Sequence, residues 1–180
     1  MIQKAINNLI RRALEEDIGD GDHTSLSCIP ESASGKARLI IKDNGIIAGL
    51  NVARVVFNMV DPEIELTMFL KDGDSVKMGD IGFVVEGRQQ SLLKAERLVL
   101  NILQRMSGIA TETNRYVNEI KEYPTLILDT RKTTPGVRVL EKEAVRIGGG
   151  ANHRMGLYDM IMLKDNHIDY AGGITNAINR

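Results

Sequence analysis

The sequence predicts an α/β protein whose two halves follow different patterns. Up to Gly87, stretches of alternating apolar and polar residues lie between helical stretches, which predicts a sheet with helices against it. From Thr125 onward, short apolar runs alternate with helical stretches, as in parallel β-α units. Only two or three such units precede Arg180, whereas a closed barrel takes about 200 residues or more. We therefore expect an incomplete parallel sheet, from the front part of a larger protein or a truncated form of one.

The N-terminal half begins with a helix and continues with short strands. Residues 2–16 repeat apolar side chains at helical spacing, and Gly19 is a natural stop signal. Residues 36–41 and 45–49 flank an Asn44-Gly45 pair, a strong hairpin signal, so these two strands are expected to pair with each other. The same periodicities predict a mostly apolar helix at 51–60 and a half-buried strand at 63–70.

Two loops suggest special functions but are better explained as structure. The acidic stretch 17–24 invites a metal-site interpretation, yet a calcium loop needs a distal Glu and a different glycine position. A turn of Asx-type hydrogen bonds explains it instead. Residues 71–87 look like the hairpins of biotinyl and lipoyl carrier domains, but no modifiable lysine lies at an exposed tip. We interpret this stretch as structural too.

The longest helical stretch runs from Ser91 to Tyr123. Residues 98–103 are apolar nearly all round, so this part is expected to be buried between domains or subunits. Arg105 then interrupts the apolar surface and must reach water, a partner anion or a ligand, because an unpaired buried charge is costly. Ser107-Gly108 is expected to break or kink the helix. We place a boundary there, which gives domains 1–107 and 108–180.

Cationic side chains gather near the ends of two predicted strands in the C-terminal half. These strands are residues 125–129 and 158–163, both short and apolar. In a parallel sheet, chemistry collects beyond the carboxyl ends of the strands. Side chains there can share one pocket suited to a small, multiply anionic ligand. The candidates are Arg131, Lys132, His153, Arg154 and Lys164.

The helix between these strands is expected to hold Pro135 in its first turn, with Thr134 as its cap, and to stop at Gly148. Its polar stripe has four-residue spacing and is interpreted as a solvated face; it consists of Arg138, Lys142 and Arg146. A further helix is expected from Ala171 onward.

The composition excludes several classes of protein. A net charge near −1 gives no basic field for nucleic acid. Cys28 is the only cysteine, which excludes an internal disulfide and a cysteine-rich zinc site. No apolar run approaches 18 residues, and the first residues start an amphipathic pattern, not a signal peptide. We expect a cytoplasmic protein that binds neither nucleic acid nor membrane.

Four motifs, taken together and in this order, resemble quinolinate phosphoribosyltransferase, also called nicotinate-nucleotide pyrophosphorylase (carboxylating). They span essentially the whole chain and are residues 16–24, 95–111, 129–136 and 148–154. The resemblance implies an N-terminal α/β sandwich followed by a (β/α) barrel of the type II phosphoribosyltransferase kind, here incomplete. It also implies a homodimer with active sites at the subunit interface.

The same resemblance implies a reaction and a set of site residues. Quinolinate would react with phosphoribosyl pyrophosphate and Mg²⁺ to give nicotinate mononucleotide, pyrophosphate and CO₂ in NAD synthesis. Arg105 matches an arginine that reaches the partner's site, and Lys132 matches a residue on the phosphoribosyl pyrophosphate side. The residues that match the quinolinate-binding set are Arg131, His153, Arg154 and Lys164. We assign the catalytic roles to Lys132 and Lys164. The family's acidic, Mg²⁺-linked residues lie on later strands that this chain lacks.

The chemistry of the residues agrees with this assignment. Quinolinate carries two adjacent carboxylates, and guanidinium groups bind carboxylates through two parallel hydrogen bonds. A protonated histidine donates from either ring nitrogen. The ring nitrogen is expected to attack the anomeric carbon as pyrophosphate leaves, and the positive nitrogen then eases loss of the neighbouring carboxylate. The protein would position groups and place charge, without a nucleophilic side chain.

Two alternatives remain open from the sequence. The first is a related phosphoribosyltransferase that acts on another acid, such as nicotinate or the substrate of a molybdenum-operon paralogue. The second is a non-catalytic sandwich module for carrying or dimerising, as the hairpin at 71–87 suggests. Competition of quinolinate against nicotinate tests the first alternative, because only quinolinate uses a second carboxylate clamp. The second predicts that changing Arg131 or Arg154 to Ala leaves function intact.

Overall fold

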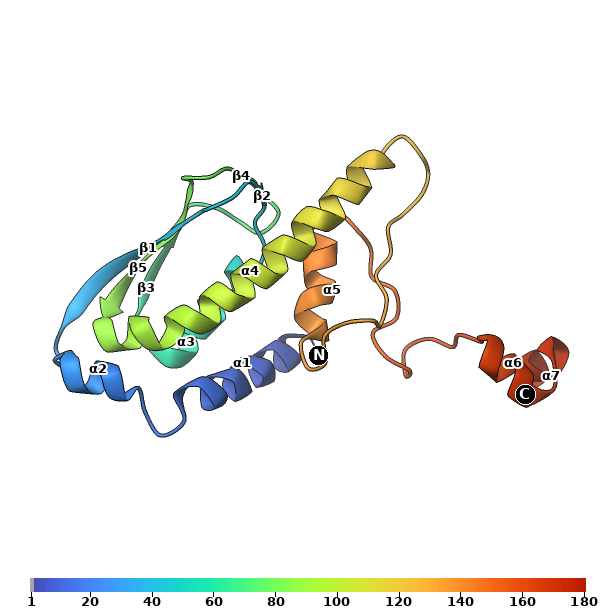
Figure 1. Ribbon diagram of the computed structural model, residues 1–180, viewed down its shortest axis with the longest axis horizontal. Helices are drawn as coiled ribbons and strands as arrows, with labels where there is room; N and C mark the ends of the chain where they lie inside the picture. The colour runs from blue at the N-terminus through green and yellow to red at the C-terminus, as the bar shows by residue number, and fades with distance from the viewer. Residues whose placement is uncertain (1) are drawn as a thin grey trace.

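The computed structural model describes residues 2–180, and it shows a mixed α/β body with a separate C-terminal segment (Figure 1). Two antiparallel sheets and a long helix form the body, and two short helices form the segment. In chain order the elements are α1 (Ile2–Ile18), α2 (His23–Cys28), β1 (Ser34–Ile40), β2 (Gly45–Ile46), α3 (Leu50–Val60), β3 (Glu65–Met68), β4 (Ser75–Val76), β5 (Ile81–Arg88), α4 (Gln89–Glu119), α5 (Arg138–Ile147), α6 (Asp165–Ala171) and α7 (Ile174–Asn179).

The sheets do not contain the hairpin that the sequence predicts at Asn44-Gly45. Strand β1 pairs with β5, from Ser34 opposite Arg88 onward, and β5 also pairs with β3, in the order β1-β5-β3. Strand β2 pairs instead with β4, with Gly45 opposite Val76. The prediction of a β1–β2 hairpin is therefore wrong. The turn connects β1 of the larger sheet to β2 of the smaller one. The side-chain oxygen of Asn44 accepts a hydrogen bond from the Met78 amide there, at 3.1 Å.

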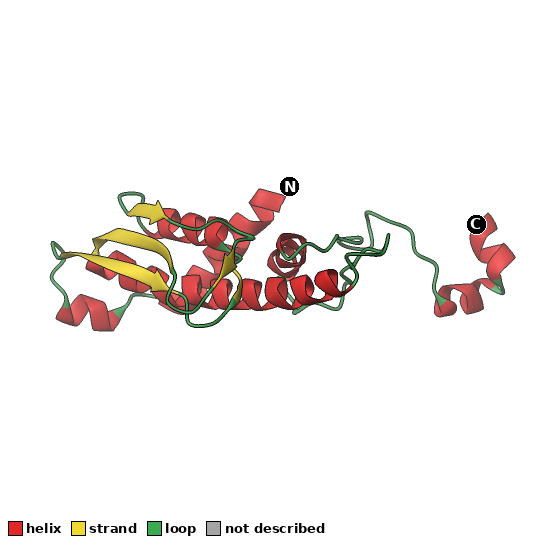
Figure 2. Cartoon of the chain, turned by 90° about the horizontal axis from the view of Figure 1, so that it is seen from above, coloured by secondary structure: helices red, strands yellow, loops and turns green. Residues whose placement is uncertain are grey.

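The core lies where α3 and α4 cover one face of the larger sheet (Figure 2). Val56 of α3 and Ala95 of α4 are fully buried. Phe57 packs edge-on against Phe83 of β5, with ring centroids 5.7 Å apart. Helix α1 adds Ile10, which is also fully buried, so the amphipathic helix expected at 2–16 is confirmed.

Helix α4 runs without a break through Ser107-Gly108, so the predicted kink is wrong. The polar side chains at this point bond to the β2 segment and leave the helix intact. Ser107 Oγ accepts from the Ala48 amide at 3.0 Å, and Thr111 Oγ1 accepts from the Ile46 amide at 2.9 Å. A polar pair that looks like a helix breaker in the sequence thus docks the second sheet onto α4. The domain boundary at residue 107 stays a prediction.

The C-terminal half departs most from the sequence prediction. Residues 125–129 and 158–163 form no strands, and the first of them makes only one isolated parallel bridge, between Leu128 and Ala151. A parallel strand needs neighbours to supply its hydrogen bonds, and none lies beside residues 158–163 in the described part of the chain. Ile161 is accordingly 91% exposed.

The helices of this half also start at other residues than predicted. Helix α5 begins at Arg138, because the chain at Pro135 and Gly136 forms a turn. The helix expected from Ala171 begins only at Ile174, as α7, because Gly172 and Gly173, both with positive φ, separate it from α6, which ends at Ala171. These two helices lie apart from the body (Figure 1).

A buried carboxylate ties α3 to the start of α4. Asp61 is 1% exposed and accepts hydrogen bonds from Arg88 Nε at 2.8 Å and Ser91 Oγ at 2.7 Å. The Glu63 amide donates to its other oxygen at 3.1 Å. The Arg88 and Ser91 hydrogen bonds hold the pKa of Asp61 well below its ordinary value of 3.8.

Because this pKa is depressed in the folded chain, Asp61 stabilises the fold above pH 3.8, and the contribution is lost as the pH falls further. Replacing Asp61 with Asn is expected to lower the free energy of unfolding by about 1–2 kcal/mol at pH 7. The loss should shrink toward pH 3, as urea unfolding at several pH values would show. Glu122→Gln, at an exposed residue, is the matched control. An equal loss of unfolding free energy at pH 7 and at pH 3 would contradict a stabilising role of the ionised Asp61 carboxylate.

Candidate active site

Arg105 leaves α4 toward α5 and meets a buried carboxylate of its own chain. Its Nη2 lies 2.6 Å and its Nε 3.0 Å from Glu141 Oε1, and Nη2 also donates to Thr134 Oγ1 at 3.0 Å. The Glu141 side chain is only 8% exposed. Burial raises the pKa of Glu141, but the hydrogen bonds from Arg105 and Thr134 outweigh it, and the pKa falls below its usual value. This pair fixes α5 against α4.

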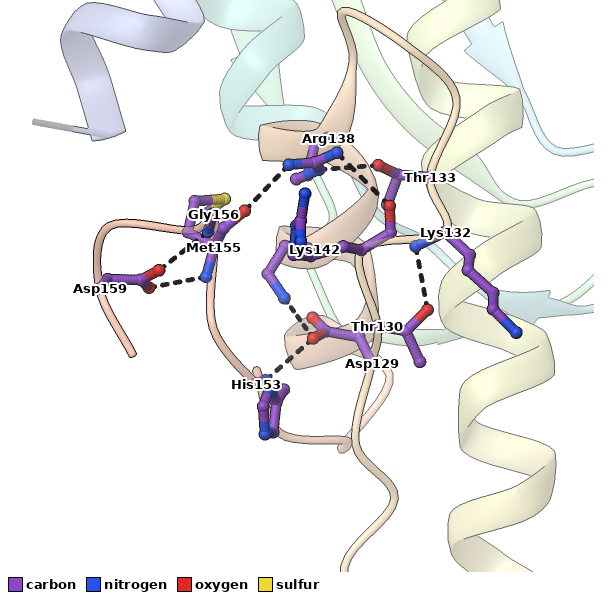
Figure 3. A network of polar contacts seen from close by, with 11 residues as sticks. Asp129, Thr130, Lys132, Thr133, Arg138, Lys142, His153, Met155, Gly156 and Asp159 are labelled. Carbon is purple, nitrogen blue, oxygen red and sulfur yellow. Dashed lines mark hydrogen bonds and ion pairs between the residues drawn. The ribbon is translucent and has the colours of Figure 1, made fainter. Parts of the chain in front are cut away.

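A second buried ion pair joins α5 to the chain that follows residue 128. Lys142 Nζ contacts Asp129 Oδ1, and the two side chains are 1% and 6% exposed (Figure 3). The same oxygen accepts from the His153 amide at 2.9 Å. The prediction that Lys142 belongs to a solvated stripe is therefore wrong. A lysine is buried only when an anion compensates its charge, and Asp129 supplies that anion.

The remaining members of that stripe differ from each other. Arg146 is exposed and pairs with Glu143 one turn earlier, as a solvated face predicts. Arg138 is half-buried and donates to Thr133 Oγ1 at 2.9 Å, to the Met155 carbonyl at 3.0 Å and to the Arg131 carbonyl at 3.4 Å. Its assignment to the solvated face is also wrong.

Four of the predicted site cations lie on two neighbouring loops beside α5. Arg131 and Lys132 follow the bridge at Leu128, and His153 and Arg154 follow its partner Ala151. Arg154 is 8% exposed and donates to the Met160 carbonyl at 3.2 Å.

The other three cations are more accessible than Arg154. Arg131 and His153 are half-buried, and Lys132 is exposed. In Figure 3 the side chains of Lys132 and His153 extend from the polar network in different directions.

Lys164 does not join this group. It is exposed at the start of α6, where its amide donates to His167 Nδ1 at 3.1 Å. Because α6 and α7 lie apart from the body (Figure 1), the five predicted cations do not converge in this structure. The roles predicted for Lys164 and Lys132 stay predictions.

A hollow of about 750 Å³ lies between α4 and residues 127–129. Arg105 and Asp129 line it, whereas Arg131, His153 and Arg154 do not. This hollow therefore contains Arg105 but none of the predicted cations beside α5.

Glycines 148–150 allow the loop of His153 to pass close to α4. A side chain at Gly148 would collide with the Ala110 carbonyl, and Gly149 has φ of +95°. The Asn114 side chain donates to the Gly148 carbonyl at 3.3 Å. The glycine-rich motif therefore serves a tight turn from α5 to the bridge at Ala151.

The described residues offer no site for a metal ion. Within residues 2–180, no three His, Cys, Asp or Glu side chains lie close enough together to hold one. In the acidic stretch 17–24, Asp22 accepts from the Ser25 amide at 3.1 Å and caps α2. The Asx-type turn predicted there is confirmed. The finding concerns only an ion held by the protein alone, because Mg²⁺ is usually bound by one or two carboxylates together with substrate phosphates.

Two family models match consecutive parts of the chain. The model described as "Quinolinate phosphoribosyl transferase, N-terminal domain" matches residues 22–107, and the model for the C-terminal domain matches residues 109–180. The chain belongs to the quinolinate phosphoribosyltransferase family.

Individual relatives agree with this family. The chain is 47% identical over 175 residues to "Quinolinate phosphoribosyltransferase [decarboxylating] 1b" of Nicotiana tabacum. This alignment covers 97% of the chain and 49% of the tobacco protein. It is 46% identical over 173 residues to a protein of Synechocystis named "Probable nicotinate-nucleotide pyrophosphorylase [carboxylating]", with 96% of the chain and 58% of that protein covered.

Solved structures of the family share the fold. The crystal structure of NadC from Streptococcus pyogenes superposes with a TM-score of 0.91 at 41% identity, covering 97% of this chain and 62% of that one. The nicotinate-nucleotide pyrophosphorylase of Francisella tularensis gives a TM-score of 0.90 at 41% identity, covering 98% and 62%. The α/β fold class predicted from the sequence is confirmed.

The chain spans about half the length of the first curated quinolinate phosphoribosyltransferases it matches. Within residues 2–180, none of the helices combines the length and the apolar character that crossing a bilayer requires. The residues that hold the predicted cations in place were not predicted as part of the site; they are Asp129, Arg138, Glu141 and Lys142. The four-residue spacing of Arg138 and Lys142, directly after a cationic loop, was the available signal.

Proposed function

We propose that this chain supplies the quinolinate-binding side of a phosphoribosyltransferase. In that reaction, quinolinate receives the phosphoribosyl group of phosphoribosyl pyrophosphate and loses CO₂ to give nicotinate mononucleotide, a step of NAD biosynthesis. Arg131, His153 and Arg154 would bind the dicarboxylate, together with Lys164. Lys132 would lie on the phosphoribosyl pyrophosphate side. The family membership of the chain supports this assignment.

The Nε of Arg131 is the single observation that carries the proposal. This atom is buried and has no hydrogen-bond partner within residues 2–180. A buried guanidinium N–H without an acceptor costs free energy, so the position favours an anion that brings one. A carboxylate of quinolinate fits because it accepts two parallel bonds from the guanidinium fork.

The proposal also includes a dimer, a metal and a location. In a homodimer, Arg105 would reach the partner's site. It would then give up some of its hydrogen bonds to Glu141 and donate to a carboxylate of the ligand. Mg²⁺ would accompany the pyrophosphate group, but the described residues hold no cluster for it. We place the activity in the cytoplasm.

Competition binding tests the substrate. Quinolinate is expected to bind the chain at least about tenfold more tightly than nicotinate, because only quinolinate offers a second carboxylate worth about 1.5–3 kcal/mol. Titration calorimetry of each acid, followed by displacement of one by the other, gives the ratio. Equal affinities would favour the related phosphoribosyltransferase with another acid. Binding of neither acid would contradict a quinolinate site formed by this chain alone.

Turnover is a separate prediction. The 180-residue chain is expected to form little or no nicotinate mononucleotide from quinolinate, phosphoribosyl pyrophosphate and Mg²⁺. The reason is that the chain spans about half the length of the first curated relatives it matches, and the family resemblance implies that the acidic, Mg²⁺-linked residues lie outside this span. Chromatographic assay of the purified chain would measure this, and robust product formation would contradict it.

A further inference from the structure

We propose that Arg138 and Lys142 of α5 are positioning residues that hold the loop of Arg131 and the loop of His153 side by side (Figure 3). The proposal rests on the function proposed above, because it concerns the geometry of that quinolinate site. Residues four apart lie on the same face of a helix, so one face of α5 reaches both loops.

The backbone alone does not hold the two loops together. Hydrogen bonds link Asp129 to Ala151 at 3.2 Å and Ala151 to Ile127 at 2.8 Å, and the parallel pairing ends there. Beyond this bridge, no backbone hydrogen bond joins residues 130–134 to residues 152–156 in the part of the chain that the structure describes. The cationic residues therefore depend on side-chain contacts for their relative positions.

Lys142 acts on the His153 loop through Asp129. The buried lysine neutralises the Asp129 carboxylate, whose Oδ1 accepts from the His153 amide at 2.9 Å. With its amide nitrogen facing this carboxylate, Asn152 donates to Asp129 Oδ2 at 2.6 Å and to the Lys142 carbonyl at 2.8 Å. Hydrogen bonds thus join the buried lysine–carboxylate pair to two consecutive residues of the loop, of which Asn152 is exposed and His153 half-buried.

Arg138 links the two loops directly. Its Nε and Nη2 donate to Thr133 and to the Arg131 carbonyl on one loop, while its Nη1 donates to the Met155 carbonyl on the other. Three acceptors in different directions match the planar fork of a guanidinium, and the single ammonium of a lysine cannot reproduce that geometry.

Such an arrangement affects function because binding groups must be placed accurately. A displacement of about 1 Å at a catalytic geometry can cost about 100-fold in rate. A carboxylate clamp divided between two loops is sensitive to their spacing for the same reason. Loss of Arg138 or Lys142 should therefore weaken ligand binding without removing any group that touches the ligand.

The test compares Lys142→Met and Arg138→Lys with Arg146→Met and Arg146→Lys as matched controls. Arg146 lies on the same helix but is exposed and pairs only with Glu143 among the described residues. Amide hydrogen exchange reports loop order, and calorimetry reports quinolinate affinity. Both site variants are expected to raise exchange at residues 151–156 and weaken quinolinate binding by about tenfold or more. The controls should change neither.

A double variant separates positioning from simple stabilisation. Lys142→Met alone leaves Asp129 buried and uncompensated, so the variant should also be less stable. Adding Asp129→Leu removes that charge and should restore stability, since an apolar pair can replace a buried ion pair. The double variant also removes the acceptor of the His153 amide, so fast exchange and weak binding should persist. Recovery of binding together with stability would overturn the proposal.

The outcomes also distinguish this proposal from the proposed function. If the unaltered chain binds quinolinate and the site variants bind it equally well, positioning is refuted and the function stands. If the unaltered chain binds no quinolinate, the proposed function of this chain fails. Exchange then decides the positioning alone: faster exchange at residues 151–156 in both site variants supports it, and unchanged exchange refutes it.

Discussion

Replacing Arg131 with alanine is expected to lower the affinity of the chain for quinolinate by about 100-fold or more. Two charge-assisted hydrogen bonds to one carboxylate contribute about 1.5–3 kcal/mol each, and their combined loss corresponds to this factor. The effect should exceed that of most single changes because the Nε of Arg131 is already buried and lacks an acceptor within the described chain. Its desolvation has occurred before the ligand arrives.

Calorimetry of Arg131→Ala, Arg131→Lys and the control Arg146→Ala would measure this effect. Lysine keeps the charge but loses the fork, so Arg131→Lys should recover only part of the affinity. Arg146→Ala should bind as the unaltered chain does, because Arg146 is exposed and pairs with Glu143. Unchanged affinity in Arg131→Ala would favour a non-catalytic module, for which this residue has no role.

Replacing Arg105 with methionine is expected to lower the free energy of unfolding by about 2–3 kcal/mol at pH 7. The change leaves Glu141 charged and buried with fewer hydrogen bonds. We place the loss below that of a fully buried pair because the Arg105 side chain is 57% exposed and water screens part of its attraction.

The pH dependence of this loss has a definite sign. The lowered pKa of Glu141 means that the carboxylate stabilises the fold above its ordinary value of 4.5, and the contribution is lost as the pH falls. Without the Arg105 hydrogen bonds, burial of Glu141 becomes the main influence on its pKa and favours the protonated carboxylic acid. The difference between the two chains should therefore shrink below pH 4.5, as urea unfolding at several pH values would show.

Glu141→Gln in the Arg105→Met background provides the control. Glutamine removes the uncompensated charge but keeps an oxygen for the Thr134 amide, which donates to Glu141 at 3.1 Å. Most of the lost stability should return. If the single variant is as stable as the unaltered chain, Arg105 does not hold α5 through Glu141. Its main role would then lie outside this ion pair, which agrees with the proposal that Arg105 reaches the site of a partner subunit.

The N-terminal half shows how far periodicity carries a prediction. Helices α1 and α3 and strand β3 lie where the pattern places them, because each has one face that must be buried. The Asn44-Gly45 turn does not join two paired strands as predicted, because turn residues specify a local bend but not which strand becomes the partner. Strand β1 has a longer partner in β5, and that choice is made by contacts between residues about fifty positions apart.

The site shows the opposite balance. The motifs predict Arg131, His153 and Arg154 as site residues, whereas the side chains that hold these loops were assigned to solvent or overlooked. Lys142 is an example, because a helix pattern cannot reveal that Asp129, thirteen residues earlier, lies against it. Only the fold brings a distant anion to a lysine and makes its burial possible.

The sequence by itself determined the α/β class, the family motifs and the positions of the cations, since these depend on local spacing and residue type. The tertiary structure decided which strands pair, that α4 continues through Ser107-Gly108, and that α5 turns Arg138 and Lys142 inward. It also decided that Lys164 lies on a separate segment. These features depend on hydrogen bonds and ion pairs between residues that are far apart in the sequence, and a local sequence pattern does not specify such long-range contacts.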